Sequence, residues 1–483
     1  MALALASLLL CLGPGNTVAA APGRPPNIVF VFADDLGYGD PACFNPQSRI
    51  ATPNIDRLAR EGIRFTDAHA PGAVCVPSRY GLLTGRYPFR PAHLNPAQGP
   101  LIEPGRVTLA SLLRDNGYAT AMIGKWHLGF ENGNKFDCAK PLRGGPLDRG
   151  FEYFFGQHAS LDIPPYFFIE NDRCVAGGPT GHVDASRTSG WSPIQGAFWR
   201  EGGIALGYQH EEILPTYTRK AADYLDARGK AGDTQPFFLY VAFTAPHTPW
   251  LPTEAFRGKS AAGLYGDWVA QLDGAVGGVL VALDRNGFAG DTLVFFTSDN
   301  GPVWYPEDVK KFGHSAAGNL RGMKADAWEG GHRMPFIARW PGKIKPGSSS
   351  AQTICFTDML ATFAALVGVK LPADAGEDSY NILPLLLDEK DHAPVREATL
   401  VGAAKGSLTI RQGDWKLIPF LGSGGFSKPS RVKPGPGDPV GQLYNLADDP
   451  GETKNLYAER PEIVRRLTAL QEKIRTEGRS VVR

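Results

Sequence analysis

Two pairs of oxygen-bearing side chains follow apolar runs that are typical of buried strands. Asp34 and Asp35 follow the run NIVFVF after one residue, and Asp299 and Asn300 follow the run TLVFFT after one residue. Because ligands of open α/β sheets bind at the carboxyl ends of the strands, we expect these four side chains to lie together. Hard cations such as Ca²⁺ or Mg²⁺ prefer such oxygen ligands, whereas zinc prefers nitrogen and sulfur. A single pair is more often a cap or a turn, but two equivalent pairs predict a metal site.

Cationic and imidazole side chains follow two further predicted strands. Lys125 and His127 come after a strand that ends at Ile123, and His247 comes after a strand that ends at Thr244. Such groups can hold anionic oxygens and transfer protons. A lone histidine is usually a structural residue, so the shared sheet edge is the reason to predict a catalytic role. The structural interpretation is kept for His69, His93, His158, His182 and His210, and it is weaker for His314 and His332.

Cys75 opens the sequence CVPSR, which ends at Arg79 and is followed by LTGR. An isolated cysteine of this kind is most often a small buried hydrophobic residue. A second interpretation makes it a thiolate nucleophile at the start of a helix. In a helix, Arg79 lies one turn after Cys75 and faces the same way. The residues alone leave these alternatives open.

The elements that must position these residues alternate between strands and helices. We predict strands at 27–32, 63–66, 118–123, 236–244 and 292–297, and helices at 52–60, 107–116 and 264–286. The first of these helices has Thr52 as its expected cap and Pro53 in its first turn. This alternation predicts an α/β sandwich around a mixed, mainly parallel sheet, which we assign to residues 24–385.

The pattern changes towards the C-terminus. An apolar helix is expected at 356–367, short strands follow from residue 398, and a final helix is expected at 461–477. We therefore predict a small α+β domain with an antiparallel sheet at residues 395–483. The stretch 422–438 is rich in Gly, Pro, Ser and Lys, which predicts a mobile loop.

Composition limits the class of protein. The chain has 483 residues, of which 43% are hydrophobic and 20% are charged, so it can form a packed core. Its 50 basic and 49 acidic residues give a net charge of +1, which argues against binding nucleic acid or anionic membranes through bulk charge. Residues 1–20 resemble a signal peptide that lacks the positive start, so we expect a secreted or periplasmic protein without a membrane span.

The six cysteines permit several disulfide arrangements. Cys11 lies in the predicted signal peptide, and four of the other five could pair, which leaves one unpaired residue. We take Cys75 as the unpaired one because of its chemical context. Cys138 and Cys174 flank a loop-rich stretch and are the favoured pair, while the pairing of Cys43 and Cys355 stays open.

Taken together, the motifs resemble those of the type I sulfatases of the alkaline phosphatase superfamily, in the branch of the arylsulfatases and the N-acetylgalactosamine-6-sulfatases. The resemblance is carried by C-x-P-S-R with L-T-G-R, and it extends over most of the chain after residue 20. The other matching segments are NIVFVFADDLGYGD, TPNIDRLAREGIRFTDAHA, GKWHLG, APHTPW, TSDNGP, RGMKADAWEGGHRMPFIARWPG, DWKLI and LYNLADDPGETKNL. The stretches 130–208 and 303–321 match no subfamily pattern and are expected to set specificity.

The resemblance implies a calcium ion and a modified cysteine. Cys75 would be oxidised to formylglycine (3-oxoalanine) by a formylglycine-generating or anaerobic sulfatase-maturating enzyme that reads the extended chain. The metal ligands carried over are Asp34, Asp35, Cys75, Asp299 and Asn300. The catalytic residues carried over are Cys75, Arg79, Lys125, His127, His247 and Lys324.

The same resemblance implies how these residues would act. The hydrated aldehyde would attack sulfur with one hydroxyl, and loss of the proton from the other would release sulfate and restore the aldehyde. Lys125 and Lys324 would hold sulfate oxygens, and Arg79 would orient the diol. His247 would be the general acid for the leaving oxygen, and His127 the base that triggers sulfate release.

The implied activity is hydrolysis of sulfate monoesters, with sulfated carbohydrates attacked from a chain end and aryl sulfates also accepted. Three alternatives remain open: a phosphate or phosphonate monoester hydrolase of the same superfamily, an inactive binder of sulfated glycans, and an enzyme that uses Cys75 as an unmodified thiol. The first differs in its preference for phosphate over sulfate esters, and the last in its sensitivity to thiol reagents.

Overall fold

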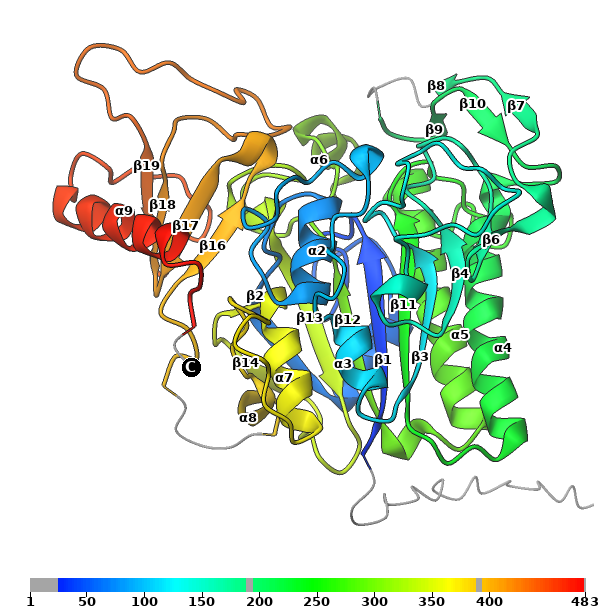
Figure 1. Cartoon of the computed structure of the whole chain (residues 1–483). Coiled ribbons are helices and arrows are strands. Elements are labelled where there is room, and N and C mark those ends of the chain that lie inside the picture. The colour runs from blue at the N-terminus through cyan, green and yellow to red at the C-terminus, as the bar shows by residue number, and fades with distance from the viewer. Residues whose placement is uncertain (1–24, 188–193, 388–392, 482–483) are drawn as a thin grey trace, which may run out of the picture.

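The first apolar run forms the centre of a large mixed sheet. In the computed structural model, which describes residues 25–187, 194–387 and 393–481, β1 (Asn27–Asp34) lies between β11 (Phe237–Pro246) and β12 (Thr292–Ser298) (Figure 1). Both neighbours run parallel to β1. All eight residues of β1 are buried, which explains why its sequence is apolar throughout instead of alternating.

Strands on both sides extend this sheet to eleven. Beyond β11 follow β3 (Ala119–Lys125), β4 (Tyr153–Gln157), β5 (Ile169–Glu170) and β6 (Arg173–Cys174). Beyond β12 follow β13 (Arg333–Arg339), β2 (Ile63–His69) and β14 (Ser348–Ser350), with β15 (Ile354–Cys355) also paired to β2. β3 and β4 continue the parallel part, whereas β13 runs antiparallel to both β12 and β2. The prediction of a mixed, mainly parallel sheet is confirmed.

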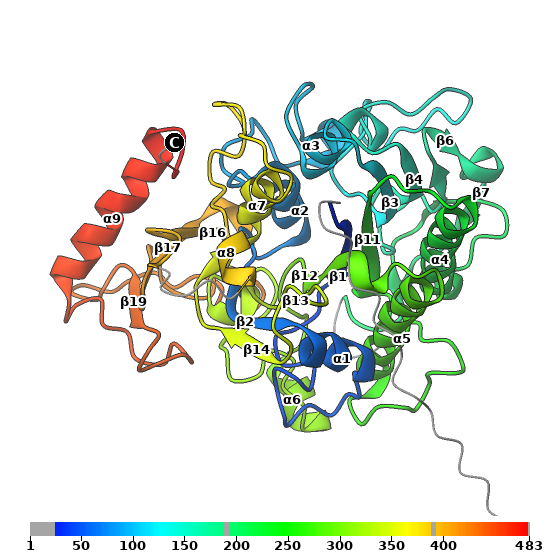
Figure 2. The same cartoon turned by 90° about the horizontal axis from the view of Figure 1, so that it is seen from below.

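Helices cover both faces of the large sheet. One face carries α1 (Pro53–Glu61), α4 (Ile213–Ala231) and α5 (Gly263–Arg285) (Figure 2). The other carries α2 (Cys75–Thr84), α3 (Leu109–Arg114), α7 (Met359–Leu366) and the short α8 (Leu383–Leu386). The helix α6 (Pro306–Phe312) lies near the carboxyl ends of the parallel strands (Figure 1).

Several element boundaries differ from the sequence prediction. Thr52 precedes α1, but its side chain does not cap the helix; its hydroxyl instead accepts a hydrogen bond from the backbone of Ala42 at 3.1 Å. α3 is shorter than predicted, and α7 begins only after a 3₁₀ turn at Phe356–Asp358. The nineteen-residue helix α4 was not predicted. These differences reflect tertiary contacts that local patterns do not contain.

A second, smaller sheet follows in the chain. It consists of β16 (Thr399–Gly402), β17 (Leu408–Gln412), β18 (Trp415–Ile418) and β19 (Gln442–Asn445), all antiparallel to their neighbours. The helix α9 (Pro461–Thr476) packs against it, and a separate apolar cluster lies between them. The predicted C-terminal antiparallel sheet and final helix are confirmed. Between β18 and β19 the chain forms an irregular loop that contains the isolated pair Leu421–Val432.

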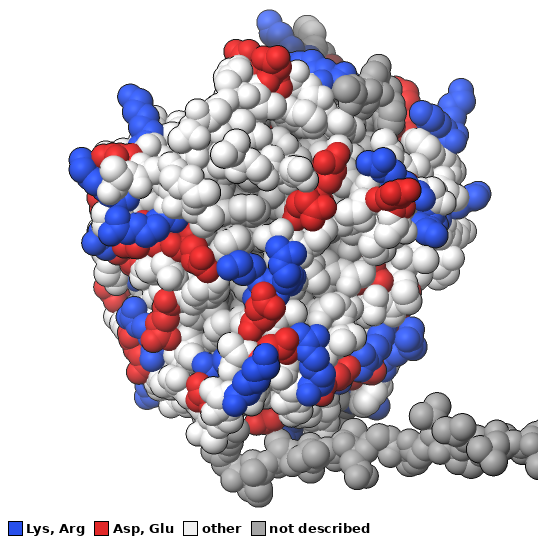
Figure 3. Space-filling view, turned by 90° about the vertical axis from the view of Figure 1, so that its right-hand side faces the viewer, with Lys and Arg blue, Asp and Glu red and all other residues white. Residues whose placement is uncertain are grey.

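Two short two-stranded sheets lie near the carboxyl edge of the parallel strands. One pairs β7 (Gly181–Val183) with β10 (Gly202–Ile204), and the other pairs β8 (Ser186–Arg187) with β9 (Phe198–Trp199). Figure 3 shows the face of the molecule on this side, where basic and acidic side chains are interspersed. Among the helices of the described residues, none is long and apolar enough to cross a membrane.

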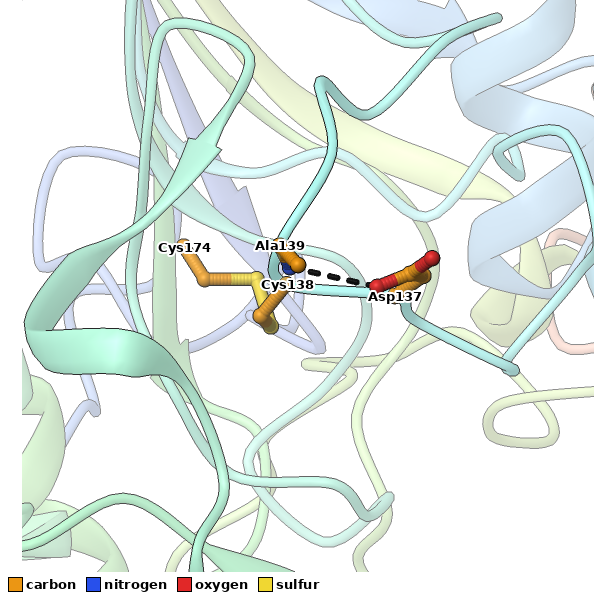
Figure 4. The surroundings of a disulfide bond; sticks show 4 residues. All are labelled: Asp137, Cys138, Ala139 and Cys174. Carbon is orange, nitrogen blue, oxygen red and sulfur yellow. Dashed lines mark hydrogen bonds between the residues drawn. A yellow bond between two sulfur atoms is a disulfide. The ribbon is translucent and has the colours of Figure 1, made fainter.

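The predicted disulfide between Cys138 and Cys174 is present (Figure 4). It joins the loop after β3 to the end of β6, with the two Cα atoms 5.4 Å apart. The sequence left the pairing of Cys43 and Cys355 open, and among the described residues Cys43, Cys75 and Cys355 are free. Cys355 lies in β15 within the sheet. Cys43 lies in the loop before α1, and its backbone N–H donates to Asp56 Oδ1 at 2.9 Å. Cys11 and the predicted signal peptide lie outside the described residues.

Candidate active site

Four oxygen-bearing side chains meet at the carboxyl edge of the sheet, as the sequence predicted. Asp34 is the last residue of β1, Asp35 follows it with a positive φ of 67°, and Asp299 and Asn300 follow β12. The backbone of Asp35 donates to Asp299 Oδ1 at 3.1 Å, and Asn300 Nδ2 donates to Asp35 Oδ1 at 2.7 Å. All four are buried, so their charges are balanced within the protein.

Each of the three carboxylates is hydrogen-bonded to a buried cation, and Arg79 Nη2 also lies 3.6 Å from Asp34 Oδ1. Lys125 Nζ lies 2.6 Å from Asp34 Oδ2, and Lys324 Nζ lies 2.6 Å from Asp35 Oδ1. Arg79 binds Asp299 Oδ2 through Nε at 3.1 Å and Nη2 at 2.7 Å. These side chains come from α2, β3 and the segment before β13, so the fold brings together residues that lie far apart in sequence. Three positive and three negative charges leave this centre close to neutral.

The pKa values in this group move in opposite directions. Burial raises the pKa of Asp299, and the nearby charge of Asp34 raises it further. Burial also acts to raise the pKa of Asp34, but Lys125, His247 and Arg79 lower it below its usual value. The negative charges of the two carboxylates repel each other, and an added cation would relieve this repulsion.

The donor set fits a hard divalent cation. Asp34 Oδ1 and Asn300 Oδ1 are buried and accept no hydrogen bond from the protein. Oxygen atoms of Asp34 and Asp35 also lie within 4.8 Å of each other and of a His247 nitrogen. Unpaired buried oxygens from carboxylate and amide groups are what Ca²⁺ binds. Asp34, Asp35, Asp299 and Asn300 could therefore hold calcium, and an oxygen on a modified Cys75 could add a further ligand.

Cys75 is the first residue of α2, and the local sequence explains why the helix starts there. Val74 is extended, Pro77 suits the first turn, and Gly85 ends the helix with a φ of 66°. Cys75 is 8% exposed. Burial raises the pKa of its thiol, although Lys125 and Lys324 act to lower it. The unmodified side chain is therefore a thiol at neutral pH, which does not favour a thiolate nucleophile.

Lys324 sits on a tight turn whose backbone is held from two sides. Its own N–H donates to Pro302 O at 2.8 Å, and the next residue, Ala325, has a φ of 73° that is unusual for alanine. The N–H of Ala325 donates to Ala73 O at 2.7 Å, which links the turn to the loop that precedes Cys75. The position of Lys324 is thus tied to that of Cys75.

The C-terminal part of the chain supports both of these segments. Ala404 donates to Ala325 O at 3.1 Å, and Gly425 packs so closely on Ala325 that an added Cβ would lie 2.3 Å from its carbonyl carbon. Ala73 donates to Gly402 O at 2.8 Å, and Gly402 donates back to Pro71 O at 2.9 Å. The small sheet is therefore part of the framework of the site.

The two predicted catalytic histidines differ in their surroundings. His247 Nδ1 lies 2.7 Å from the carbonyl oxygen of Thr248, so Nδ1 carries a proton, and Nε2 lies 3.7 Å from Asp35 Oδ2. His127 is buried with a φ of 58°, and its Nδ1 has no hydrogen-bond partner. Burial lowers the pKa of His127 well below its usual value, and Lys125 and Arg79 lower it further. His127 is thus neutral, which is the form in which a histidine can accept a proton.

A cavity of ≈ 190 Å³ opens onto this centre. Asp35, His247 and Lys324 form its polar base. Its other walls are formed by Asp162, Ile194, Arg200, Pro246, Thr248, Trp250, Tyr265, Val303 and Phe426. Cavities that hold drug-sized ligands are usually about 300–1,000 Å³, so this one suits a single small ring.

The sequence motifs do not mark four polar or aromatic residues of this cavity, namely Asp162, Arg200, Tyr265 and Phe426. Asp162 and Arg200 lie within the stretch 130–208 that was expected to set specificity, but no motif marked them. Phe426 lies in the loop between β18 and β19, about a hundred residues after Lys324. Only the proximity of these loops to the predicted site could have indicated their role.

The histidines with the weaker structural interpretation lie outside the cavity. His314 binds Asp40 Oδ1 at 2.8 Å. His332 binds His69, with their Nδ1 atoms 3.0 Å apart, in a separate buried cluster. These contacts satisfy both residues and give them structural roles.

Comparison with known proteins agrees with this site. A family model described as Sulfatase matches residues 26–369. An N-acetylgalactosamine-6-O-sulfatase of Bacteroides thetaiotaomicron is 35% identical over 487 residues, covering 94% of this chain and 94% of that protein. Arylsulfatase A of Homo sapiens is 35% identical over 489 residues, covering 96% of this chain and 90% of that protein.

Solved structures give the same picture. One, from work on the metabolism of multiple glycosaminoglycans by Bacteroides thetaiotaomicron, has a TM-score of 0.82 at 34% identity and covers 94% of this chain and 100% of that one. A sulfatase from Pseudoalteromonas sp. has a TM-score of 0.72 at 26% identity and covers 93% of this chain and 90% of that one.

Proposed function

Because the chain belongs to the sulfatase family and is a sulfuric ester hydrolase, we propose that it removes sulfate from the end of sulfated carbohydrate chains and also cleaves aryl sulfates. The observation that carries this proposal is the grouping of Arg79, Lys125 and Lys324 around the carboxylates beside Cys75. The small cavity supports action on a terminal sugar, because it has room for one ring.

Maturation of Cys75 to formylglycine belongs to this proposal. When present, the hydrated aldehyde supplies the attacking hydroxyl and a second hydroxyl whose deprotonation releases sulfate. Asp34, Asp35, Asp299 and Asn300 would hold calcium, which would supply positive charge next to the nucleophile and the sulfate. The buried thiol with its raised pKa gives the unmodified side chain no comparable route to attack.

Lys125 and Lys324 hold the sulfate oxygens in this scheme. Each ammonium group has three donors, so it can keep its bond to Asp34 or Asp35 and still donate to the substrate. Arg79 is fixed by Asp299 one helical turn after Cys75 and orients the residue at that position. These cations stabilise the charge that spreads over the sulfate in the transition state.

The two histidines move the protons. His247 lines the cavity, with Nδ1 bound to the carbonyl oxygen of Thr248 and Nε2 3.7 Å from Asp35 Oδ2, so we assign it as the donor to the leaving alcohol oxygen. His127 is neutral and has an unpaired Nδ1, so it accepts the proton whose loss releases sulfate. His247 is thus assigned as the acid and His127 as the base.

A phosphate or phosphonate monoester hydrolase is the closest alternative. A two-zinc phosphatase needs a Ser or Thr nucleophile and additional Asp or His ligands, whereas this centre presents Cys75 and one oxygen-rich group. The test compares turnover of 4-nitrophenyl sulfate and 4-nitrophenyl phosphate, together with the mass of the peptide that contains Cys75. Faster cleavage of the phosphate, or an unmodified thiol in fully active enzyme, would contradict the proposal. An inactive glycan binder would cleave neither ester.

Three further features complete the proposal. Residues 1–20 act as a signal peptide, so the protein is secreted or periplasmic. A formylglycine-generating or anaerobic sulfatase-maturating enzyme is its partner during synthesis. The catalytic domain spans residues 24–385, and the C-terminal domain spans residues 395–483.

A further inference from the structure

We infer that Asp162 and Arg200 form a pair that reads two neighbouring hydroxyl groups on the sugar of a sulfated substrate. This inference rests on the proposed function and adds the part of the substrate that the cavity recognises. Both residues line the cavity beside His247 and Lys324, so a sugar whose sulfate reaches the catalytic centre would contact them.

The pair is built by two loops that hold each other. Arg200 Nη1 donates to Asp162 Oδ2 at 2.6 Å and to Asp162 O at 3.0 Å. The backbone N–H of Arg200 donates to the same carbonyl at 3.3 Å, and Tyr166 Oη donates to Arg200 O at 2.7 Å. The guanidinium lies 5.2 Å from the centre of the Phe198 ring. These contacts fix the orientation of both side chains before a substrate binds.

Each member of the pair keeps unused hydrogen-bonding capacity. Asp162 has a side chain that is only 7% exposed, yet its Oδ1 accepts no hydrogen bond. Arg200 is 51% exposed, and both of its side-chain bonds to Asp162 use the same nitrogen, Nη1. A buried acceptor without a partner calls for a ligand or water, and a guanidinium has five donors.

These capacities match a pair of adjacent sugar hydroxyls. One hydroxyl can donate to Asp162 while its neighbour accepts from Arg200, and the ion pair as a whole carries no net charge that would repel or mis-seat the sulfate. Trp250 and Phe426 add aromatic surface to the cavity, which suits the apolar face of a sugar ring. An aryl sulfate has no such hydroxyls and would gain nothing from the pair.

A competing role for Asp162 acts through His247, because Asp162 Oδ1 lies 4.0 Å from His247 Nδ1. In that case the carboxylate would stabilise the protonated imidazole and would affect every substrate equally. A recognition role instead affects substrates according to their hydroxyls. The two roles are therefore separated by comparing substrates, and by the pH profile of kcat.

The experiment measures kcat/KM for 4-nitrophenyl sulfate and for the 6-sulfates of galactose, N-acetylgalactosamine and glucosamine, with 3-deoxy and 4-deoxy analogues of the best of these sugars. In Asp162→Asn and Arg200→Met, we expect kcat/KM for the sugar sulfate to fall roughly 10–100-fold more than for 4-nitrophenyl sulfate, mainly through KM. The variants should also lose their preference for the hydroxylated sugar over its deoxy analogues. The pH profile of kcat should keep its midpoints.

Two control variants change charged residues close to this pair in sequence but outside the cavity. Arg187→Ala removes a guanidinium 5.3 Å from the same Phe198 ring but outside the cavity, and Asp184→Asn changes a side chain that is 99% exposed; neither should alter the substrate ratio. Equal losses on sugar and aryl substrates with a shifted pH profile would overturn the inference. So would cleavage of 4-nitrophenyl sulfate with no sulfated monosaccharide accepted, which would still leave the sulfatase activity established. If Asp162→Asn fails to fold, the ratio of kcat/KM for the sugar sulfate and 4-nitrophenyl sulfate in Arg200→Met, at a half-exposed position, tests the inference.

Discussion

Two buried clusters of this molecule contain the same kinds of charged side chains but differ in how completely these satisfy one another. One is the candidate active site. The other, which we call the interdomain cluster, lies between the large and small sheets and consists of Asp67, His69, Glu329, His332, Arg411, Lys416 and Glu452. Each contains three side chains whose donor atoms lie within 4.8 Å, as a metal site requires.

In the interdomain cluster the charged groups contact one another closely, and only Glu452 Oε1 is buried without a hydrogen bond, although it lies 2.9 Å from Lys416 Nζ. Lys416 Nζ lies 2.9 Å from carboxylate oxygens of both Glu329 and Glu452 and 3.1 Å from His332 Nε2, so an ammonium group occupies the place that a metal ion would take. His69 binds both Asp67 and His332 at 3.0 Å. In the active site, by contrast, Asp34 Oδ1, Asn300 Oδ1 and His127 Nδ1 are buried without a hydrogen-bond partner. A cavity lined by Asp35, His247 and Lys324 opens onto the same centre. Unsatisfied buried atoms, more than the residue types, distinguish a reactive centre from a structural one.

The strongest test of this contrast is the loss of Cys75. We expect Cys75→Ala to lower multiple-turnover kcat by at least about 10⁴-fold, because the group at the centre of the site is removed. Cys75→Ser should turn over at most once, since its single hydroxyl would remain as a stable sulfate ester. Steady-state and burst kinetics with 4-nitrophenyl sulfate measure both effects. Sustained turnover by the serine variant would contradict the proposed role.

Breaking the interdomain cluster should instead reduce stability. Lys416→Met leaves Glu329 and Glu452 buried without their shared cation, and we expect unfolding to become easier by about 3–5 kcal/mol. The kcat/KM of the folded fraction should stay within about threefold of the original. Lys454→Met is the control, because its pair with Glu459 is 69% and 56% exposed and should contribute under about 1 kcal/mol. Equal urea midpoints for the two variants would refute the comparison.

Calcium should affect the active site and leave the interdomain cluster unchanged. Chelation should lower kcat roughly 10²–10³-fold and reduce the thermal midpoint, and added Ca²⁺ should restore both. Asp34→Asn should weaken this response, whereas His69→Asn should not, although its cluster also has metal-like geometry. Calorimetry and activity as functions of free Ca²⁺ measure the difference. If the His69 variant lost its response to calcium, the ion would bind in the interdomain cluster, which would contradict this prediction.

The smallest expected effect is a pH dependence of stability from Glu452. Burial raises its pKa to about 7, and Lys416 only partly offsets this. The folded state therefore binds a proton that the unfolded state, with a glutamate pKa near ~4.3, has already released. The contribution of Glu452 is fully present below that unfolded value and is lost as the pH rises to about 7. Unfolding free energies at pH 5 and pH 8 should differ less in Glu452→Gln than in the original protein, and parallel changes would contradict this account.

The sequence predicted the centre of the molecule better than its edges. β1, β11 and β12 are continuous apolar runs, so their burial could be predicted, and the acids at their ends followed from strand direction. The strands β5 to β10 span only two or three residues, which is too short for a periodic pattern. The loops that carry Asp162 and Arg200 are paired by tertiary contacts, so their place in the cavity could not be inferred from local sequence.

The cysteines and Thr52 show the same limit. Thr52 has the right identity and position for a helix cap, but a nearby backbone N–H takes its hydroxyl. Cys43 and Cys355 are free because pairing depends on distance in space, which residue counts do not supply. The Cys138–Cys174 bridge could be predicted because both residues flank one loop-rich stretch.

The hydrogen bonds between Gly402 and the loop at 71–73 also have a consequence for the order of events during synthesis. The strand that holds the loop before Cys75 is translated 327 residues after it, since 402 − 75 = 327. At about 5–20 residues per second, the ribosome needs roughly 16–65 s to reach that point. For that interval the nascent segment lacks the neighbour that finally encloses it, which leaves time for an enzyme that needs an extended chain to modify Cys75.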